Sequence, residues 1–210
     1  MMFYCDFAPG REWDGPYHEH EYGFPLATDA ELFERLLLEI NQAGLSWLTI
    51  LKKREAFRRA YRGFDPELVA RFGARDRRRL LADAGIIRNR LKVDAAITNA
   101  GKLLELRKTH GSFAGWLDAH LLVPKSSGQR STVNRQRLRT TPEWVTLFRD
   151  TFRFTGGEIV REFLVSTGYL PDAHRESCPV YPKVLALDPP WARARAALTP
   201  APRRARPRPG

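Results

Sequence analysis

The stretch Leu38-Glu39-Ile40-Asn41-Gln42-Ala43-Gly44-Leu45-Ser46-Trp47 has the pattern of one helix ending and another beginning. Gly44 suits the left-handed conformation that ends many helices, and the Ser46 hydroxyl suits the cap of the next helix. Upstream, Thr28-Asp29-Ala30-Glu31 is a capping-box pattern, in which a Thr and a Glu three residues later bind free amides. The sequence therefore predicts a helix that starts after Thr28, a tight turn at Gly44 and a second helix from Ser46.

Glu39 is the unusual residue of this stretch, because it falls on or beside the apolar stripe of its helix. It lies seven residues after Leu32 and three after Leu36, at about 100° per residue. A carboxylate in that position needs a partner, a proton or a ligand. Two interpretations fit the pattern: Glu39 reaches water at the edge of the stripe, or it faces a ligand site. Trp47 likewise fits either the core or a pocket wall.

Further along the chain, the predicted helices carry much basic charge. The helix over residues 46–61 has a basic side, for which a solvated face is the simplest interpretation, formed by Lys52, Lys53, Arg54, Arg58 and Arg59. Asp65-Pro66 then has the pattern of a cap and first residue of a short helix over 66–72.

Residues 77–93 have the pattern of a helix-hairpin-helix. A helix ends at Gly85, an apolar hairpin follows, and a basic helix continues to about Lys108. The amides at a helix start, with cationic side chains beside them, can hold a phosphate without reading base sequence. The candidates for such contacts are Gly85, Arg88, Arg90 and Lys92. An ordinary antiparallel helix pair fits the pattern equally well.

The two cysteines lie near opposite ends of the chain, and each has histidine nearby. Cys5 precedes His18 and His20, while His174 and Cys178 are four residues apart. Two thiolates and two imidazoles complete a closed tetrahedral zinc site of the structural type. The sequence therefore indicates one zinc per chain that joins the terminal segments, with His18 and His20 as competing ligands.

Composition limits the class of protein. The chain has 210 residues and a net charge of +11, and no stretch approaches the length of a membrane span. These features predict a cytoplasmic protein with a polyanionic partner. Further helices are expected over 113–120, 142–152 and 157–167, with a long loop at 124–141. No alternating strand pattern appears, so the predicted fold class is all-α. We expect one two-lobed helical domain over 1–190 and a disordered Arg-rich tail over 191–210.

Several of these motifs together resemble the DNA-3-methyladenine glycosylase I family. The similarity extends over about residues 5–182, and its most specific pieces are residues 42–47, 51–55 and 83–88, whose sequences are QAGLSW, LKKRE and DAGIIR. The resemblance implies an all-α helix-hairpin-helix glycosylase fold with a zinc clip. It further implies that the zinc ligands are Cys5, His18, His174 and Cys178, without His20.

The resemblance also implies an activity and a base pocket. Such an enzyme flips an alkylated base such as 3-methyladenine out of double-stranded DNA and releases it by hydrolysis of the glycosidic bond. Glu39 would read the base, and the pocket residues around it would be Tyr17, Trp47 and Tyr22. We expect a monomer with no membrane partner.

The pocket segments also depart from the family pattern. Tyr22 stands where the family usually has Trp, Asp14 lies where an aromatic residue is common, and Ile40-Asn41 replace Gly and Gln. The competing interpretation is therefore a zinc-clipped helix-hairpin-helix protein that binds DNA but is inactive or has altered specificity.

Overall fold

Helices make up most of the protein, and one of them is central. The structure, a computed structural model, describes residues 3–124 and 136–199. The first half contains η1 Tyr4–Asp6, α1 Asp14–His20, α2 Asp29–Gln42, α3 Trp47–Ala60, η2 Arg62–Phe64, α4 Pro66–Val69, α5 Ala74–Ala82 and α6 Arg90–His110. The second half contains α7 Phe113–Leu121, β1 Leu122–Pro124, β2 Gln136–Leu138, α8 Thr141–Thr151, α9 Gly157–Ser166, α10 Tyr181–Ala186 and α11 Pro190–Leu198.

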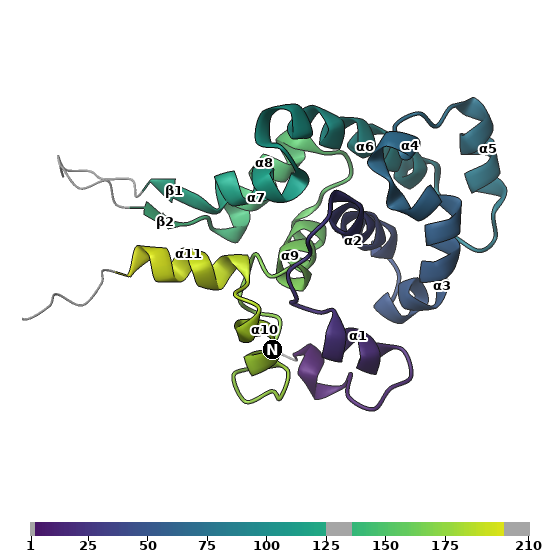
Figure 1. Ribbon diagram of the computed structural model, residues 1–210. Coiled ribbons are helices and arrows are strands. Elements are labelled where there is room, and N and C mark those ends of the chain that lie inside the picture. Colours follow the sequence, from purple (N-terminus) through teal and green to yellow (C-terminus); the bar gives the residue numbers. More distant parts are fainter. Residues whose placement is uncertain (1–2, 125–135, 200–210) are drawn as a thin grey trace, which may run out of the picture.

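Helix α2 forms the centre of the core. Its capping box is confirmed, because the Thr28 hydroxyl accepts from the Glu31 amide at 3.2 Å and the Glu31 carboxylate accepts from the Thr28 amide at 2.9 Å. Leu32, Leu36 and Ile40 are fully buried. Helices α3, α6, α7 and α9 all contact α2, which runs through the middle of the molecule (Figure 1). The position of every residue on α2 is therefore fixed by packing on several sides.

The turn after α2 forms as the sequence predicts. Gly44 has a φ of +81°, in the left-handed region, and the Ser46 hydroxyl accepts from the Thr49 amide at 3.2 Å. Lys92 of α6 stabilises this turn, since its Nζ donates to the carbonyl oxygens of Asn41 at 2.9 Å and Ala43 at 2.8 Å. The end of α2 and the start of α6 are thereby joined.

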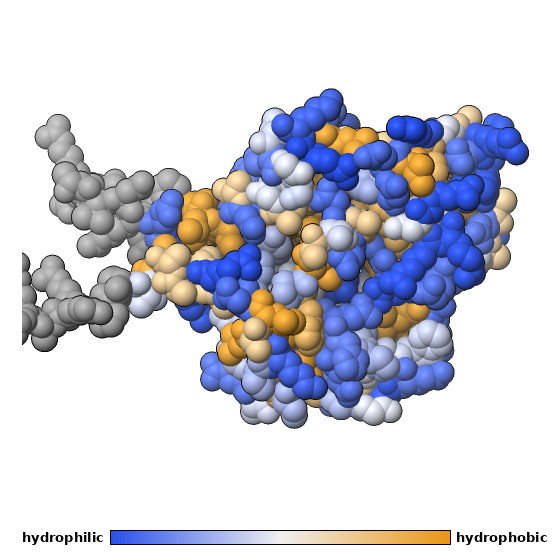
Figure 2. All heavy atoms as spheres, viewed as in Figure 1, coloured by the Kyte–Doolittle hydropathy of each residue, from blue (hydrophilic) through white to orange (hydrophobic). Residues whose placement is uncertain are grey.

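The basic side of α3 is only partly solvated. Figure 2 shows hydrophilic residues over α3, where Lys52 and Arg59 are exposed. Two arginines of the same helix, Arg54 and Arg58, instead bind the buried Glu34 of α2. Arg54 also binds the half-buried Glu21, which directly follows α1. Arg54 Nε lies 2.5 Å from Glu34 and its Nη1 lies 2.6 Å from Glu21. These pairs fix α3 against α1 and α2.

The fold is mostly helical, as predicted, but the expectation of no strands was wrong. Leu122 pairs with Leu138 and Val123 with Arg137 in a two-stranded antiparallel sheet. Each strand has three residues, which is too short for an alternating pattern to be recognised. Strand β2 falls within the predicted 124–141 loop, and β1 reaches that loop only at Pro124. Residues 125–135 of the loop lie outside the described residues.

The expected tail boundary at residue 191 was also wrong. Residues 190–198 form α11, in which Trp191 and Ala194 are buried. Pro190 at the first helical position supplies a helix start that the Arg-rich composition hid. Residues 200–210 of the predicted tail lie outside the described residues. None of the helices in the described segments is long and apolar enough to cross a membrane.

The N-terminal segment lies beside the segment around α10, although they are far apart in sequence (Figure 1). Arg175 forms an ion pair with Asp6 across this contact. Helices α1 and α10 were not predicted, because both are short. Helix α1 carries Tyr17 and His18 into the protein interior, where both are buried.

Candidate functional site

Glu39 lies inside the protein, on the buried side of α2. Its side chain is only 4 % exposed, which excludes the water-facing interpretation. Burial raises the pKa of Glu39 to about 8, the nearby Arg35 guanidinium opposes this shift, and Glu162 and Glu158 add to it. At neutral pH the empty site therefore holds this carboxyl largely protonated, and a cationic ligand would favour its ionised form.

Arg35 is the most important residue near Glu39 that the sequence did not reveal. It precedes Glu39 by one helical turn and is 2 % exposed. Its Nη1 donates to the Tyr17 hydroxyl at 2.7 Å and to the Ser166 carbonyl at 3.3 Å. The guanidinium also lies 4.9 Å from the Tyr17 ring centroid. Arg35 thus fixes Tyr17 and supplies the buried positive charge closest to Glu39 on α2.

Aromatic side chains from α1, from the segment that follows it and from the start of α3 gather near Glu39. The Tyr17 ring centroid lies 5.1 Å from that of Trp47 and 5.7 Å from that of Tyr22. Because the Tyr17 and Trp47 rings touch, they form one continuous wall instead of two facing plates. Among the described residues, no acceptor lies within hydrogen-bond distance of the buried Trp47 Nε1. Within the described part of the chain, Trp47 Nε1 is therefore a buried N–H donor without a partner at the edge of this wall.

Tyr4 completes this wall, although no sequence motif indicates it. Its ring lies 5.0 Å from Tyr22 and 5.8 Å from Tyr17, and its hydroxyl donates to buried Asp14 at 2.7 Å. Asp14 therefore contributes no stacking surface to the wall, and it accepts a hydrogen bond from Tyr4 instead.

A second carboxylate faces the wall from α9. The Tyr22 hydroxyl donates to Glu162 Oε2 at 3.1 Å. Burial raises the pKa of Glu162, and its neighbour Arg161 forms an ion pair with it. The sequence analysis missed Glu162, because a single Glu on an amphipathic helix has no distinctive pattern.

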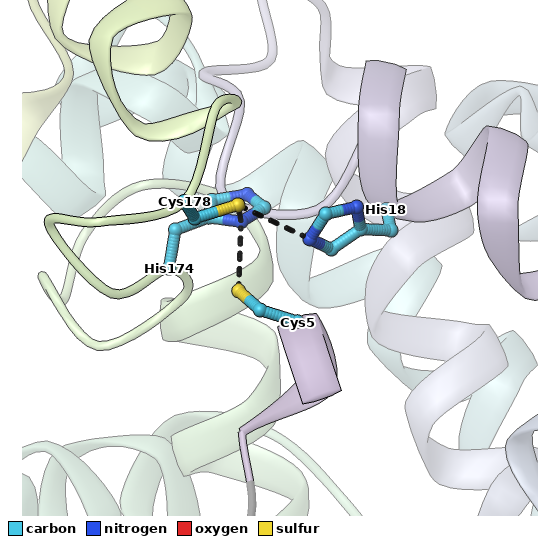
Figure 3. A group of neighbouring side chains, drawn as sticks. All are labelled: Cys5, His18, His174 and Cys178. Carbon is cyan, nitrogen blue, oxygen red and sulfur yellow. Dashed lines mark hydrogen bonds between the residues drawn. The ribbon is translucent and has the colours of Figure 1, made fainter. Parts of the chain in front are cut away.

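The four predicted metal ligands come together, as Figure 3 shows. Their donor atoms all lie within 4.8 Å of one another and belong to Cys5, His18, His174 and Cys178. Cys5 Sγ lies 3.5 Å from His174 Nδ1, and Cys178 Sγ lies 3.6 Å from His18 Nε2. Ligands of a tetrahedral zinc ion are separated by roughly 3.3–3.8 Å, given the usual zinc bond lengths. The cluster is therefore of the right size to bind a metal ion.

Hydrogen bonding around this cluster prepares one imidazole for a metal. His174 Nε2 donates to the Tyr22 carbonyl at 2.7 Å, which leaves Nδ1 with a lone pair directed at both thiols. Burial lowers the pKa of His18 and of His174, so both rings are neutral near pH 7. The competing ligand His20 does not join the cluster, because its side chain is 70 % exposed.

The hairpin at residues 83–89 is pinned to α3. Lys53 Nζ donates to the carbonyls of Ala84 at 2.9 Å and Gly85 at 3.3 Å. The Asp83 side chain accepts from the Gly85 amide at 2.7 Å, and Asn89 caps α6. Arg88 and Arg90 are exposed beside the cap. Lys92, by contrast, is buried and bound to the α2 carbonyls, so it is not free to bind phosphate.

The mostly helical fold is similar to those of solved 3-methyladenine DNA glycosylases. The 3-methyladenine DNA glycosylase I from Staphylococcus aureus is 35 % identical, with a TM-score of 0.70 over 85 % of this chain and 96 % of that one. A Tyr-to-Phe variant of 3-methyladenine DNA glycosylase I, in complex with 3-methyladenine, gives a TM-score of 0.71 at 34 % identity, over 87 % of this chain and 100 % of that one.

The chain belongs to the methyladenine glycosylase family, whose sequence model matches residues 11–181. A curated relative is DNA-3-methyladenine glycosylase 1 of Escherichia coli strain K12. It is 36 % identical over 169 residues, which are 79 % of this chain and 90 % of that protein. The resemblance seen in the motifs is thereby confirmed.

Proposed function

We propose that the protein is a DNA base-excision repair glycosylase that releases 3-methyladenine from alkylated double-stranded DNA. The observation that carries this proposal is the buried Glu39 carboxyl beside an aromatic wall, in a chain of the methyladenine glycosylase family.

The chemistry of the lesion fits this site. Adenine alkylated at N3 is cationic while it is attached to deoxyribose, so its glycosidic bond is already weak. The protein must flip the nucleotide out, hold the base and admit water to the sugar carbon. The base stacks on the wall formed by Tyr4, Tyr17, Tyr22 and Trp47. Glu39 accepts an N–H of the base in its ionised form, which the positive charge of the lesion stabilises.

Selectivity follows from the protonation of Glu39 in the empty site. Neutral adenine offers an N–H donor but no charge, so it does not stabilise the ionised carboxylate. Arg35 is too firmly bonded to Tyr17 and the Ser166 carbonyl to turn toward a ligand. Discrimination against normal bases therefore comes from the electrostatic balance around Glu39.

The metal ion is structural zinc, held by Cys5, His18, His174 and Cys178. Two sulfur and two nitrogen donors fill a tetrahedral shell and leave no position for water, so zinc stabilises the fold without chemistry of its own. Its second effect is indirect: His18 follows Tyr17, and His174 binds the Tyr22 carbonyl, so the metal site positions two wall residues.

DNA is held through its backbone by a helix-hairpin-helix formed by α5, the 83–89 hairpin and α6. The side chains of Arg88 and Arg90 lie at its exposed end, where phosphates would bind. The Gly85 amide, also a candidate from the sequence, instead donates to the Asp83 side chain at 2.7 Å, so it is not free to bind a phosphate. Lys92 supports this element from inside.

The test is release of free base from methylated duplex DNA, followed by chromatography. Wild-type protein is expected to release 3-methyladenine. Glu39→Gln keeps the size of the side chain and loses its charge, and should lower the rate by about 10²-fold if it removes ~3 kcal/mol of charge-assisted hydrogen bonding. Glu55→Gln, an exposed site on α3, is the matched control with unchanged activity.

The competing function, a DNA-binding protein without activity, gives a different result. It would bind duplex DNA in a salt-dependent way and release no base at all. Base release at the wild-type rate by Glu39→Gln would instead exclude the role proposed for Glu39.

A further inference from the structure

Phe154, in the turn between α8 and α9, has an unusual backbone conformation. Its φ is +62°, in the left-handed region that bulky side chains rarely occupy. Its ring is 38 % exposed, although the neighbouring Phe152 is buried in the core. The backbone strain and the exposure of the apolar ring to water each lower the stability of the fold, and strained residues are frequent at functional sites.

The surrounding contacts hold this conformation in place. Asn99 of α6 is fully buried and binds the Arg153 backbone on both sides, accepting from its amide at 2.7 Å and donating to its carbonyl at 3.0 Å. The buried Thr155 hydroxyl donates to the Phe148 carbonyl at 3.1 Å. Both neighbours of Phe154 are thus fixed, so its ring is presented outward by a rigid turn.

Phe154 lies at the proposed DNA-binding face. Lys92 Nζ, which supports the 43–46 turn, is 5.9 Å from the centre of the Phe154 ring. Leu91, next to Lys92, is 68 % exposed, and Leu45 of the same turn is 42 % exposed. An apolar ridge therefore stands beside the exposed Arg88 and Arg90.

The other side of Phe154 is hollow and cationic. A cavity of about 430 Å³ lies between Arg149, Arg153, Phe154 and Ile159. Both arginines are exposed, and the acidic side chain nearest in sequence is the exposed Asp150. A polyanion with apolar edges, such as duplex DNA with an unstacked base step, matches this combination of charge and shape.

Helix α9 connects this ridge to the base pocket. It begins three residues after Phe154 and carries Glu158 and Glu162, whose charges act on Glu39. A ring at this position would contact DNA next to the nucleotide whose base enters the pocket.

We propose that Phe154 is a DNA wedge, which packs against the unstacked base pairs beside the flipped-out nucleotide. This inference rests on the proposed glycosylase function. The DNA backbone that base flipping displaces lies in the hollow beside Phe154, and its phosphates lie near Arg149 and Arg153.

The variant Phe154→Gly tests this proposal without endangering the fold, because glycine adopts a positive φ freely. Its melting temperature should equal or exceed that of the wild type. Its affinity for a duplex with an abasic-site analogue should fall about ten-fold, within the range that loss of one base–aromatic contact produces. The fluorescence of 2-aminopurine placed beside the abasic site should fall toward that of the free duplex.

Asp188→Gly is the matched control, since Asp188 has a φ of +49° between α10 and α11. It relieves the same kind of strain and should leave DNA binding unchanged. Phe154→Trp keeps an aromatic ring and should retain most of the affinity.

A third measurement separates this proposal from the glycosylase function itself. Free 3-methyladenine should quench tryptophan fluorescence equally in the wild type and in Phe154→Gly. The wedge proposal would be wrong if Phe154→Gly bound the duplex and changed the 2-aminopurine signal as the wild type does. It would also be wrong if this variant lost binding of the free base. A wild type that neither binds nor releases 3-methyladenine would overturn the glycosylase function instead.

Discussion

The Tyr22 hydroxyl donates a 3.1 Å hydrogen bond to Glu162 Oε2, and this bond joins α9 to the aromatic wall. The resemblance to the family leads us to expect Trp at the position of Tyr22, and an indole has a different size and donor position. The bond thus holds a second carboxylate near Glu39, and its charge adds to the raised pKa of Glu39. The surroundings of Glu39 are therefore more acidic than Glu39 alone would make them.

Replacing Glu162 should change how Glu39 titrates. Glu162→Gln keeps an acceptor for Tyr22 but removes a negative charge, so the pKa of Glu39 should fall by roughly one unit. The pH dependence of free 3-methyladenine binding measures this shift. Tyr22→Phe, which removes the hydrogen bond and keeps the Glu162 charge, should move the profile less. An unchanged profile in Glu162→Gln would mean that the two carboxylates are not coupled.

The raised pKa of Glu39 has a consequence for stability. The folded protein favours protonated Glu39. The contribution of this group to the free energy of unfolding is therefore complete below its ordinary pKa of 4.5 and is lost as pH rises through about 8. Glu39→Gln does not titrate. The free energy of unfolding of this variant, relative to that of the wild type, should therefore be higher at pH 9 than at pH 5 by about 1 kcal/mol or more. Urea denaturation at the two pH values measures the gain, and a constant difference would contradict it.

Metal analysis tests the zinc site. Purified protein should contain one zinc per chain, and Cys178→Ser should lose it. The free energy of unfolding should fall by about 3 kcal/mol or more, because binding energy at a closed metal site is folding energy. His20→Ala is the control, since His20 is exposed and outside the cluster. Zinc-free wild-type protein, prepared without chelator, would refute the assignment.

The two ends of α6 provide a test of phosphate binding. Arg90→Ala should weaken binding to all duplex sequences alike and reduce the salt slope by about one unit. Lys108→Ala removes the same charge from the far end of the same 21-residue helix, where the side chain is exposed. It should leave the slope unchanged. Equal effects of both variants would indicate a general charge effect without a hairpin contact.

Local signals in the sequence predicted the parts of the fold that depend on short-range chemistry. The Thr28–Glu31 capping box, the left-handed Gly44 and the Ser46 cap all formed as expected. The apolar stripe of α2 predicts that Glu39 lies on or beside its buried side but leaves open whether the carboxylate reaches water, and the structure shows that it is buried. The pairing of Cys and His residues at the two ends correctly identified the cluster.

Contacts between distant segments could not be predicted in this way. Arg35 has the spacing of an ordinary helix residue, and only the approach of α1 and α9 makes it a buried partner of Tyr17 and Ser166. Lys92 was assigned to the DNA because its neighbours are basic, but the carbonyls at the end of α2 bind it. Tyr4 and Glu162 likewise join the pocket only through tertiary packing.

The cluster of Cys5, His18, His174 and Cys178 also sets an order of events during protein synthesis. Half of its donors lie within the first 18 residues, and the other half leave the ribosome only after nearly the whole domain has been made. Helix α1 carries Tyr17 directly before His18, so the pocket wall lacks its final anchor until residue 178 has emerged. Helix α9, which packs against α2, and Ala194 of the same core are also made late. A nascent chain therefore completes its core and its aromatic wall at nearly the same point, when almost all of residues 1–194 have emerged.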